Sequence, residues 1–333
     1  MPVLTLTEAE VLVVRTLTSC RTEEHNAESV ARALVAAEAD GQAGHGLSRL
    51  PTYAAQAKVG KVDGFAQPTL EWRRPAAARV DAKHGFAYPA IDLALDALPA
   101  AARQNGIAAA GITHSHHCGV LGHAVERLAD QGLAALMFAN TPAAIAPWGG
   151  ARAVFGTNPI AFACPLPGDK MPIVVDLSLS KVARGSILAA KQRGEAIPEG
   201  WALDTQGKPT IDPAAALAGT MLPLGDAKGT ALALVVELLA AGLVGANFAA
   251  EASSFLDAKG PAPGTGQLLI AFDPTVFGSN LDRFAALAAQ IESQSGARLP
   301  GAKRLALRAK AVREGVIVSD GLLADIGKIA EMP

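Results

Sequence analysis

The hydrophobic pattern of this chain changes twice along its length, and the change limits the folds that the chain can adopt. Up to about residue 70, apolar residues recur at helical spacing. From about residue 75, short apolar runs alternate with longer helical segments, and from residue 281 the helical spacing returns. Strands that alternate with helices are typical of α/β folds. We therefore predict an α/β domain over residues 73–280 and a helical domain built from residues 1–72 and 281–333.

Three helices are predicted before residue 70. Thr7 and Glu10 have the spacing of a capping box, so the first helix should begin there. The second should run over residues 26–40 and end at Gly41, because glycine commonly follows the last helical turn. The third should cover residues 48–60.

The middle of the chain predicts both strands and helices. Strands are expected over the short apolar runs 107–112, 133–139, 160–163, 173–176 and 267–272. Helices are expected over the longer segments 88–104, 121–131, 181–191 and 228–244. Residues 191–223 carry Gly, Pro and Asp at turn-like intervals, which indicates an ordered excursion, and residues 258–266 should form a loop.

Composition and charge exclude several classes of protein. No apolar run reaches the roughly 18 residues that span a bilayer, and the longest candidate, residues 230–246, is interrupted by Glu237, Gly242 and Gly245. The net charge is −2 with scattered basic residues, which argues against nucleic-acid binding. The three cysteines form no CxxC pair, and the first residues lack the basic start of a secretory signal. We expect a cytoplasmic protein that binds neither membranes nor nucleic acids.

The usual dinucleotide-binding fingerprint is missing. Residues 264–269 (GTGQLL) have two glycines at the right spacing but no third, and they lead into a predicted strand instead of a helix. The sequence also contains no P-loop and no GxSxG nucleophile elbow. A Rossmann domain is therefore not predicted.

Residues 43–49 (AGHGLSR) form the first candidate site. His45 lies between two glycines in a sterically open turn, and Arg49 follows on the first turn of a predicted helix. Histidine titrates near neutral pH and arginine binds carboxylates in a planar fork, so the pair suits a general acid beside a carboxylate clamp. A loop histidine with a solvated arginine is the plainer interpretation.

The second candidate is a histidine cluster. Four of the seven histidines, His114, His116, His117 and His123, lie within ten residues at the C-terminal end of a predicted strand. Open α/β sheets place their sites at such strand ends. Acid–base or substrate contact, a metal site and a plain structural role all fit the cluster. We expect no metal, because the sequence has no carboxylate at ligand spacing, no HExxH and no CxxC.

Polar turns form the third candidate. Glycine, threonine, asparagine and lysine recur in the turns at 140–142, 147–150, 156–159 and 222–229. Backbone N–H groups at helix N-termini can hold a phosphate, and Lys228 at such an end would add a positive charge. Together these turns outline an anion-binding rim.

With these motifs, the chain resembles the malate/L-lactate dehydrogenase family of the second type, which is unrelated to the Rossmann-fold lactate and malate dehydrogenases. The matching segments run in family order over most of the chain: HGLSRL (45–50), HHCG (116–119), FGTNPIAFA (155–163), VVDLSLS (174–180), PEGWALD (198–204), GKPTIDP (207–213) and GDAKGTALALVVELL (225–239). Within the family, the segments NTPAAIAPWGG and ALAGTMLP look most like the bacterial sulfolactate dehydrogenase branch, and next come the reductases of Δ1-piperideine- and Δ1-pyrroline-2-carboxylate.

The resemblance implies a homodimer that binds NADP or NAD, with NADP as the first choice, on a non-Rossmann mixed-sheet α/β domain, while the helical domain completes the active site. By matched position, His117 is the proton-transferring residue, His45 lies close by as a second catalytic and substrate-binding residue, and Arg49 holds the substrate carboxylate. The implied cofactor contacts are Thr141, Thr157, Asn158, Asp176, Leu177, Ser178 and Lys228.

The implied reaction is hydride transfer between a nicotinamide and a small 2-oxo or 2-hydroxy acid. An imine reductase that acts on Δ1-piperideine- or Δ1-pyrroline-2-carboxylate is the alternative, although Gly44 stands where the family usually has a serine. Thr230 replaces the usual aromatic residue, and this departure bears on the cofactor preference. More remote alternatives are a metal-dependent hydrolase or lyase built on the histidine cluster, and a non-catalytic binding protein.

Overall fold

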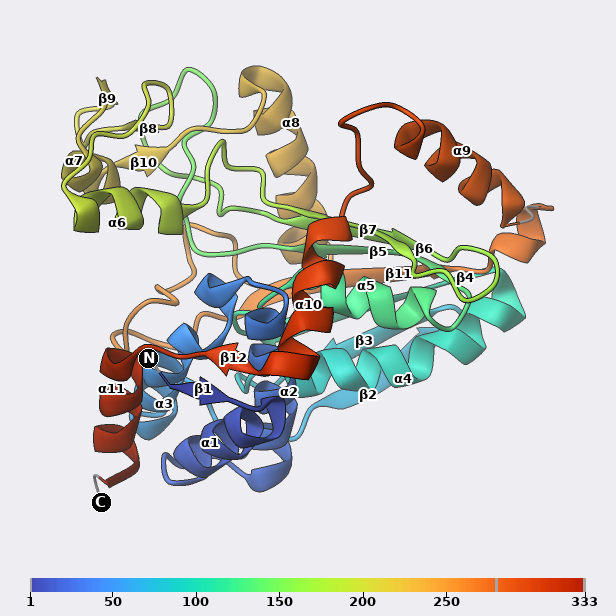
Figure 1. The fold of residues 1–333 in the computed structure, drawn as a ribbon, viewed down its shortest axis with the longest axis horizontal. Helices are drawn as coiled ribbons and strands as arrows, with labels where there is room; N and C mark the ends of the chain where they lie inside the picture. Colours follow the sequence, from blue (N-terminus) through green and yellow to red (C-terminus); the bar gives the residue numbers. More distant parts are fainter. Residues whose placement is uncertain (1, 279–280, 332–333) are drawn as a thin grey trace.

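A seven-stranded sheet organises the computed structural model, which describes residues 2–278 and 281–331 (Figure 1). Its strand order is β2-β3-β4-β11-β5-β6-β7, and only β3 and β4 run parallel. The strands are β2 (Thr69–Arg74), β3 (Ala77–Asp81), β4 (Ile107–Ser115), β5 (Ala134–Ala139), β6 (Ile160–Cys164), β7 (Ile173–Leu177) and β11 (Thr265–Phe272). The expected mixed-sheet α/β fold is therefore present, and all five expected strands belong to this sheet. The loop expected over residues 258–266 is two residues shorter, because β11 already begins at Thr265.

Helices cover both faces of this sheet. Alternate residues of β4 point to opposite faces, as in any strand. Ala110 and Ile112 belong to the core formed with α4 (Ala87–Asn105) and α5 (Leu121–Ala129). On the other face, a Cβ atom at Gly111 would lie 2.9 Å from the side chain of Val244, which follows α8 (Asp226–Glu237) and the π-helical η3 (Leu238–Gly242). The helix predicted over 228–244 is thus an α-helix that continues as a π-helical turn.

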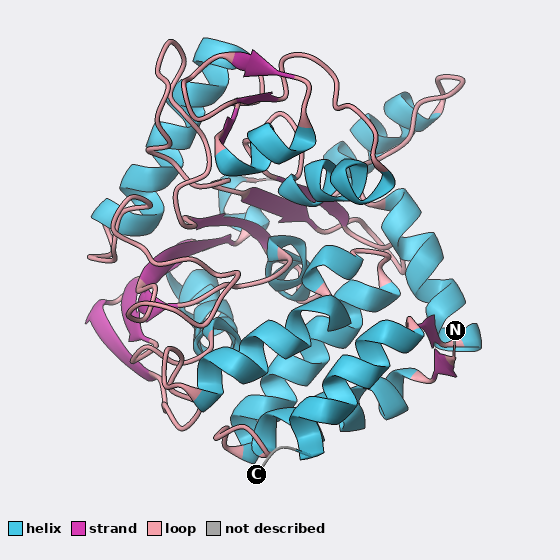
Figure 2. Cartoon of the chain, turned by 90° about the vertical axis from the view of Figure 1, so that its left-hand side faces the viewer, coloured by secondary structure: helices cyan, strands magenta, loops and turns pink. Residues whose placement is uncertain are grey.

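Segments from both ends of the chain share a second hydrophobic core. It contains residues of α1 (Leu6–Thr18), α2 (Glu24–Ala39), α3 (Leu50–Lys58), α10 (Ala302–Glu314) and α11 (Asp320–Glu331). β1 (Val3–Leu4) pairs antiparallel with β12 (Val316–Ile317), so the two ends lie side by side. Figure 2 shows these helices gathered in the lower block of the molecule. α9 (Asp282–Glu292) contributes nothing to this core and lies over the far end of the sheet in Figure 1.

The first helix begins two residues earlier than expected. Thr5 caps it, with its hydroxyl accepting from the Glu8 N–H at 3.2 Å while the Glu8 carboxylate accepts from the Thr5 N–H at 2.8 Å. The spacing T-x-x-E occurs twice here, at Thr5 and at Thr7. The prediction that the helix begins with a capping box at Thr7 and Glu10 is wrong. The earlier start places Leu6 in the helix, where it packs against the second hydrophobic core.

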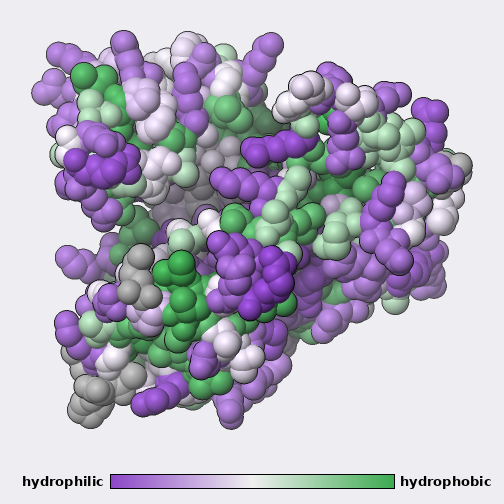
Figure 3. Space-filling view, in the orientation of Figure 1, coloured by the Kyte–Doolittle hydropathy of each residue, from purple (hydrophilic) through white to green (hydrophobic). Residues whose placement is uncertain are grey.

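The excursion predicted over residues 191–223 is ordered. It carries the end of α6 (Arg184–Arg193), α7 (Pro213–Ala218) and a small sheet of β8 (Ala202–Leu203), β9 (Pro209–Thr210) and β10 (Thr220–Met221). Ile187, Ala202 and Met221 form a separate core with Ile145 and Phe155 from the main domain. Figure 1 shows this part at the upper left, above the terminal helices, and the surface is hollowed between the two (Figure 3). No helix among the described residues is both long and apolar enough to cross a membrane.

Candidate active site

Several of the predicted site segments meet at one edge of the main sheet. β4 and β5 end there, and their neighbour β11 begins there, with Ser115 opposite Thr265 and Ala139 opposite Gln267. β6 begins and β7 ends at the same edge, because Ile160 pairs with Leu177. The histidine turn after β4, the polar turn after β5, the turn before β6 and the segment after β7 are therefore neighbours. This edge points toward the hollow between the excursion and the terminal helices (Figures 1 and 3).

His117 is buried at this edge and is bonded to a tyrosine. Its Nδ1 lies 2.5 Å from the hydroxyl of Tyr53, on α3, and that hydroxyl lies 3.1 Å from the hydroxyl of Tyr88, on α4. Both tyrosines are buried, and burial raises the pKa of each above its ordinary value. Burial and the charge of Arg49 hold the pKa of His117 well below 6.5. The imidazole is therefore neutral at pH 7, and its second nitrogen is the one available to a substrate.

His45 stacks on His117. The two ring centroids are 5.3 Å apart and the ring planes differ by 8°. His45 Nδ1 is buried and makes no hydrogen bond within the described residues, and burial and Arg49 lower the pKa of His45 to about 4. The turn that carries His45 needs Gly46, because a Cβ atom there would lie 2.2 Å from the Glu38 carboxylate, which accepts from the Leu47 N–H at 2.9 Å. The tight turn thus presents His45 to His117.

Arg49 lies beside this histidine pair with free donors. Its Nε donates to the Gly44 carbonyl at 2.7 Å, and its two terminal nitrogens make no hydrogen bond within the described residues. The bond to Gly44 holds the guanidinium at the turn that carries His45, and its charge contributes, after burial, to the lowered pKa of both His45 and His117. An arginine with its fork free beside two neutral imidazoles can bind a carboxylate.

His116 and Phe255 form the wall behind His117. The His116 ring contacts Phe86 and Phe255 at centroid distances of 6.2 and 5.1 Å, and Phe255 also contacts His117 at 5.3 Å. Both ring nitrogens of His116 are buried and have no hydrogen-bond partner in the part of the chain that the structure describes, and burial lowers the pKa of His116 to about 3. His116 is therefore an uncharged wall residue at neutral pH.

A buried lysine ties the Phe255 loop to α3. Lys61 is 3% exposed, and its ammonium donates to the carbonyls of Ser254, Asp257 and Lys259 at 2.7, 3.0 and 2.6 Å. Gln56 adds bonds to the carbonyls of Phe255 and Asp257. These contacts fix Phe255 against the histidines.

The two predicted threonines of the rim are in contact. The Thr141 hydroxyl accepts from the Thr157 N–H at 2.9 Å and lies 3.3 Å from the Thr157 hydroxyl. The neighbouring Gly156 allows this approach, because a Cβ atom there would lie 2.2 Å from the Thr141 carbonyl oxygen. The turns after β5 and before β6 therefore form one unit with hydroxyls at its surface.

Asn158, in contrast, faces the protein interior. It is fully buried at a φ of 39°, and its amide donates to Glu237 at 2.7 Å and to the Ala233 carbonyl at 3.0 Å. The Glu237 carboxylate also accepts from Asn140 at 3.2 Å and from the Ala249 N–H at 2.6 Å. Asn158 therefore joins the rim to α8 from inside instead of presenting its amide to the cleft.

The segment Asp176 to Ser178 lies between the histidine turn and the rim. Asp176 accepts from the Gly122 N–H at 2.7 Å, at the start of α5, just after the histidine turn. Asp176 and Leu177 are the last residues of β7, and both are exposed. The Ser178 hydroxyl lies 3.1 Å from that of Ser180. The next residue, Leu179, donates to the Thr157 carbonyl at 2.8 Å. All three residues therefore border the same cleft.

Lys228 is exposed on the first turn of α8. Leu224, just before this helix, donates its N–H to the Leu179 carbonyl at 2.8 Å, which places the helix start beside the segment after β7. Gly225 caps the helix with a φ of 66°. Gly229 is required in the first turn, because a Cβ atom there would lie 1.6 Å from the Leu224 carbonyl oxygen. The positive helix terminus and Lys228 together suit an anion.

His114 and His123 are engaged elsewhere. His114 bonds to Asp81 at 2.9 Å, and His123 bonds to Asp40 at 2.8 Å. Burial favours the neutral acid at Asp40, but hydrogen bonds from Arg308 and His123 outweigh it and lower the pKa of Asp40 to about 2. The histidine cluster is therefore split: His116 and His117 lie at the site, while His114 and His123 bond to carboxylates outside it. Within residues 2–278 and 281–331, no three His, Cys, Asp or Glu side chains are arranged to hold a metal ion.

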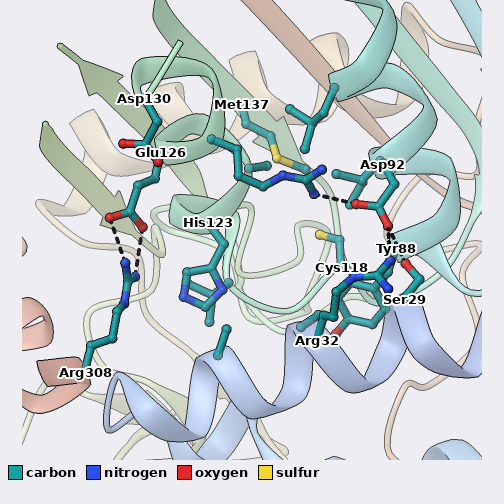
Figure 4. Close-up of a pocket in the computed structure, with 17 residues that line it drawn as sticks. Ser29, Arg32, Tyr88, Asp92, Cys118, His123, Glu126, Asp130, Met137 and Arg308 are labelled. Carbon is teal, nitrogen blue, oxygen red and sulfur yellow. Dashed lines mark hydrogen bonds and ion pairs between the residues drawn. The ribbon is translucent and has the colours of Figure 1, made fainter. Parts of the chain in front are cut away.

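A cavity of about 530 Å³ lies behind the histidine turn. Tyr88, Cys118 and His123 line it, together with residues of α2, α4, α5 and α10 (Figure 4). Figure 4 also shows Arg308 bonded to Glu126, part of a buried ionic cluster that joins α10 to α5. Neither His45 nor Arg49 lines this cavity, so it is separate from the cleft described above.

The chain matches the family model described as malate/L-lactate dehydrogenase over residues 4–327. It is 53% identical to a (2R)-3-sulfolactate dehydrogenase (NADP(+)) of Chromohalobacter salexigens over 306 residues, which cover 92% of this chain and 91% of that protein. It is 41% identical to a Δ1-pyrroline-2-carboxylate reductase of Ancylobacter novellus over 328 residues, which cover 97% and 96%.

Solved structures agree with these matches. The fold superposes on a Δ1-piperideine-2-carboxylate reductase from Pseudomonas syringae with a TM-score of 0.93 and 37% identity, over 99% of this chain and 100% of that one. It also superposes on a sulfolactate dehydrogenase from Methanocaldococcus jannaschii with a TM-score of 0.90 and 28% identity, over 98% and 96%.

Proposed function

This chain belongs to the malate/L-lactate dehydrogenase family and is an NAD(P)-dependent oxidoreductase, and we propose that it interconverts a small 2-oxo acid with its 2-hydroxy acid. 3-Sulfolactate and its 2-oxo counterpart are the first substrate pair to test, with NADP as the cofactor, because the 53% identical relative carries that name. The stacked pair of His45 and His117 beside the free fork of Arg49 is the observation that carries the proposal.

Arg49 binds the substrate carboxylate in this proposal. A planar guanidinium fixes a carboxylate in two hydrogen bonds and so presents one face of C2 to the cleft. The bound carboxylate also offsets the positive charge that lowers the pKa of His117. Substrate binding therefore raises the pKa of His117. The ring can then take up a proton and pass it to the oxygen of the substrate. Tyr53 holds Nδ1, so the free nitrogen delivers the proton.

The rim has the features that a dinucleotide needs. A bound nicotinamide supplies the hydride for C2. Thr141 and Thr157 present hydroxyls where their two turns meet, an approach that Gly156 allows because it has no side chain. Lys228 adds a positive charge at the start of α8. Asp176, Leu177 and Ser178 line the passage from this rim to His117. We propose these residues as cofactor contacts, with Asn158 and Glu237 supporting the rim from inside.

A spectrophotometric panel tests the proposal. 3-Sulfopyruvate, oxaloacetate, pyruvate and the two cyclic imines are each mixed with NADPH or NADH, and nicotinamide absorbance is followed. The proposal expects oxidation of NADPH with at least one 2-oxo acid. Turnover of the imines alone would overturn it in favour of the second candidate below.

Imine reduction is the second candidate function, and its support is the similarity to the reductases of Δ1-pyrroline- and Δ1-piperideine-2-carboxylate. Gly44 argues against it, because the serine that the family usually has there is absent. A Cβ atom at Gly44 would meet nothing within 4 Å, so Gly44→Ser is sterically allowed. The candidate predicts that Gly44→Ser raises the imine activity relative to the 2-oxo acid activity. An unchanged ratio would contradict it.

We further propose that the protein is a cytoplasmic homodimer. The division into a helical domain of residues 1–72 and 281–333 and an α/β domain of residues 73–280 stays a prediction. The second core, shared by both ends of the chain, supports it, and the separate position of α9 argues for ending the helical part nearer to α10.

A further inference from the structure

The cavity behind the histidine turn has no part in the reaction proposed above. Its volume is about 530 Å³, and residues of both hydrophobic cores line it. Protein interiors are close-packed and leave few voids larger than a water molecule. Pockets that bind small molecules have volumes of roughly 300–1,000 Å³. The space at this junction of two cores is therefore large enough for a small organic molecule.

The inner walls of the cavity are apolar. Ile91, Leu95 and Met137 line it and belong to the core of the main sheet. Ala33 and Ala36 form the wall on α2, and both are half-buried. Helix positions three apart lie on the same face, so α2 turns two methyl groups toward the space. Larger side chains at these positions would close the cavity, and the sequence keeps it open.

One side of the cavity carries two arginines for one carboxylate. Arg32 donates to Asp92 at 3.2 Å, and Arg127 pairs with the same carboxylate, which also accepts from the Ser29 hydroxyl at 2.6 Å. The Arg32 and Arg127 side chains are 54% and 48% exposed, so they lie where the cavity opens to solvent. Each uses one nitrogen for Asp92 and makes no other side-chain bond within the described residues. One positive charge and several N–H donors are therefore free for an anion.

The other side of the cavity does not suit an anion. All three side-chain nitrogens of Arg308 are already bonded to carboxylates. Asp130 adds a further carboxyl group there, and burial and the nearby Glu126 carboxylate raise the pKa of Asp130. Figure 4 shows Arg308, Glu126 and Asp130 together, on the side away from Arg32. An acid group is therefore directed to Arg32 and Arg127, and the rest of its molecule to the apolar walls.

We propose that this cavity is a binding site for an amphipathic anion, a carboxylate or sulfonate on a compact apolar body. The acid group binds Arg32 and Arg127, and the apolar body covers Ile91, Leu95 and Met137. A small 2-oxo acid has too little apolar surface to cover these walls. A dinucleotide would leave several polar groups unpaired against them, which costs free energy. The ligand is therefore neither the substrate nor the cofactor of the cleft.

The cavity and the cleft share a wall but not an opening. Cys118 lines the cavity and directly follows His117 in the chain. Tyr88 also lines it, and its hydroxyl lies 3.1 Å from that of Tyr53, the partner of His117. A ligand in the cavity therefore contacts residues that hold His117 from behind. The cavity and the cleft can be filled at the same time.

Fluorescence titration with 8-anilinonaphthalene-1-sulfonate tests the proposal. This dye is an aromatic sulfonate that emits strongly in apolar sites, and saturating NADP⁺ keeps it out of the cofactor rim. We expect one saturable site per wild-type chain. Arg127→Gln should weaken dye binding at least about tenfold, because it removes a charge-assisted hydrogen bond. Arg73→Gln is the matched control, since Arg73 is exposed on β2 and pairs with Glu71, and it should bind the dye as the wild type does.

Filling the cavity gives a second measurement. Ala36→Phe places a ring in the space and should abolish the dye signal, whereas Ala286→Phe, at an exposed position of α9, should keep it. Thermal melts check that both variants are folded. A folded Ala36→Phe protein that binds the dye normally would overturn the proposal. If Ala36→Phe does not fold, Arg127→Gln decides, and an affinity equal to that of the wild type overturns the site.

Two further comparisons identify what is recognised and where. 4-Phenylbutyrate should displace the dye, and 4-phenylbutylamine should not, because only the first carries an acid group. Equal displacement by both would overturn the preference for an anion. Arg49→Lys should leave dye binding unchanged, and a loss there would place the dye in the cleft and overturn the separate site. None of these measurements depends on turnover, so their outcome is independent of the reaction proposed for the cleft.

Discussion

The hydroxyl of Tyr53 lies 2.5 Å from Nδ1 of His117, and both residues are buried. One nitrogen of the imidazole is therefore committed to the protein, and the ring cannot rotate without losing this bond. The Tyr88 hydroxyl, 3.1 Å from that of Tyr53, extends the connection. The pair fixes which nitrogen of His117 faces the cleft, and this is the geometry that a proton-transferring histidine requires.

Replacing His117 by Ala should lower kcat for a 2-oxo acid at least about a hundredfold, because a general acid contributes roughly 10²–10⁴-fold. NADPH affinity should be unchanged. His45→Ala should act partly through substrate binding and raise KM. Steady-state kinetics over a pH series and cofactor fluorescence titration measure both. The assignment is reversed if His45→Ala abolishes turnover while His117→Ala keeps a near-normal kcat.

Tyr53→Phe should lower kcat about tenfold with KM little changed, because one hydrogen bond of roughly 1.5 kcal/mol positions His117. The acid side of the pH–rate profile should shift as well, since Nδ1 loses its partner. Tyr88→Phe is the control, because it leaves the Tyr53–His117 bond in place. Equal effects of the two substitutions would assign Tyr53 to packing alone.

Arg49→Lys should raise KM for 2-oxo acids strongly and leave NADPH affinity intact, because lysine keeps the charge but loses the planar fork. Arg49→Met should in addition raise the pKa of His45 and His117 in the free enzyme, since the positive charge lowers both. Histidine NMR titration checks the second effect. Wild-type kinetics in Arg49→Lys would move the carboxylate clamp to another residue.

Lys228→Ala should weaken NADPH binding at least about tenfold, because one charge-assisted hydrogen bond contributes roughly 1.5–3 kcal/mol. Lys208→Ala, at an exposed turn of the excursion, is the matched control and should bind as the wild type does. Fluorescence titration of both variants gives the comparison. An unchanged affinity in Lys228→Ala would leave this lysine without a cofactor role.

His116→Phe should reduce the loss of stability at acid pH. Because the pKa of His116 is about 3 in the folded protein and near 6.5 in the unfolded chain, the unfolded chain takes up the proton first. Stability is therefore lost as pH falls from about 6.5 toward 3, and His116 accounts for about 2 kcal/mol of that loss by pH 5. Urea unfolding at pH 7 and pH 5 measures it. The exposed His25 is the control, and a His116→Phe protein as acid-sensitive as His25→Asn would refute the argument.

The sequence predicted those strands and helices that have a clear local hydrophobic pattern. Apolar runs such as residues 160–163 gave the central strands, because strands buried on both faces need them. β2 was missed, since it is an edge strand whose residues are mostly exposed and include Glu71, Arg73 and Arg74. Its partner β3 was missed as well, because Arg79 and Asp81 interrupt its apolar residues. Edge strands carry charge to avoid pairing with other chains, and that removes their signal.

Some residues of the candidate site could be predicted from the sequence and others could not. His45, Arg49 and His117 stand in distinctive turns, and the resemblance to the family indicated their roles. Tyr53 and Phe255 could not be found, because their link to His117 exists only once residues 53, 117 and 255 are brought together. In the sequence, Tyr53 is one apolar position of a helix. Asn158 is the opposite case. The sequence showed the motif that contains it, but it did not show that its side chain faces the protein interior.

The buried ammonium of Lys61 also sets an order of events during synthesis. Its three carbonyl partners lie 193 to 198 residues further along the chain. Chains emerge from the ribosome N-terminal end first, so α3 and Lys61 are exposed long before residues 254–259 exist. The N-terminal helices therefore reach their final packing only after most of the chain has been translated, and a chain interrupted before residue 254 keeps an unpaired cation where its core should close.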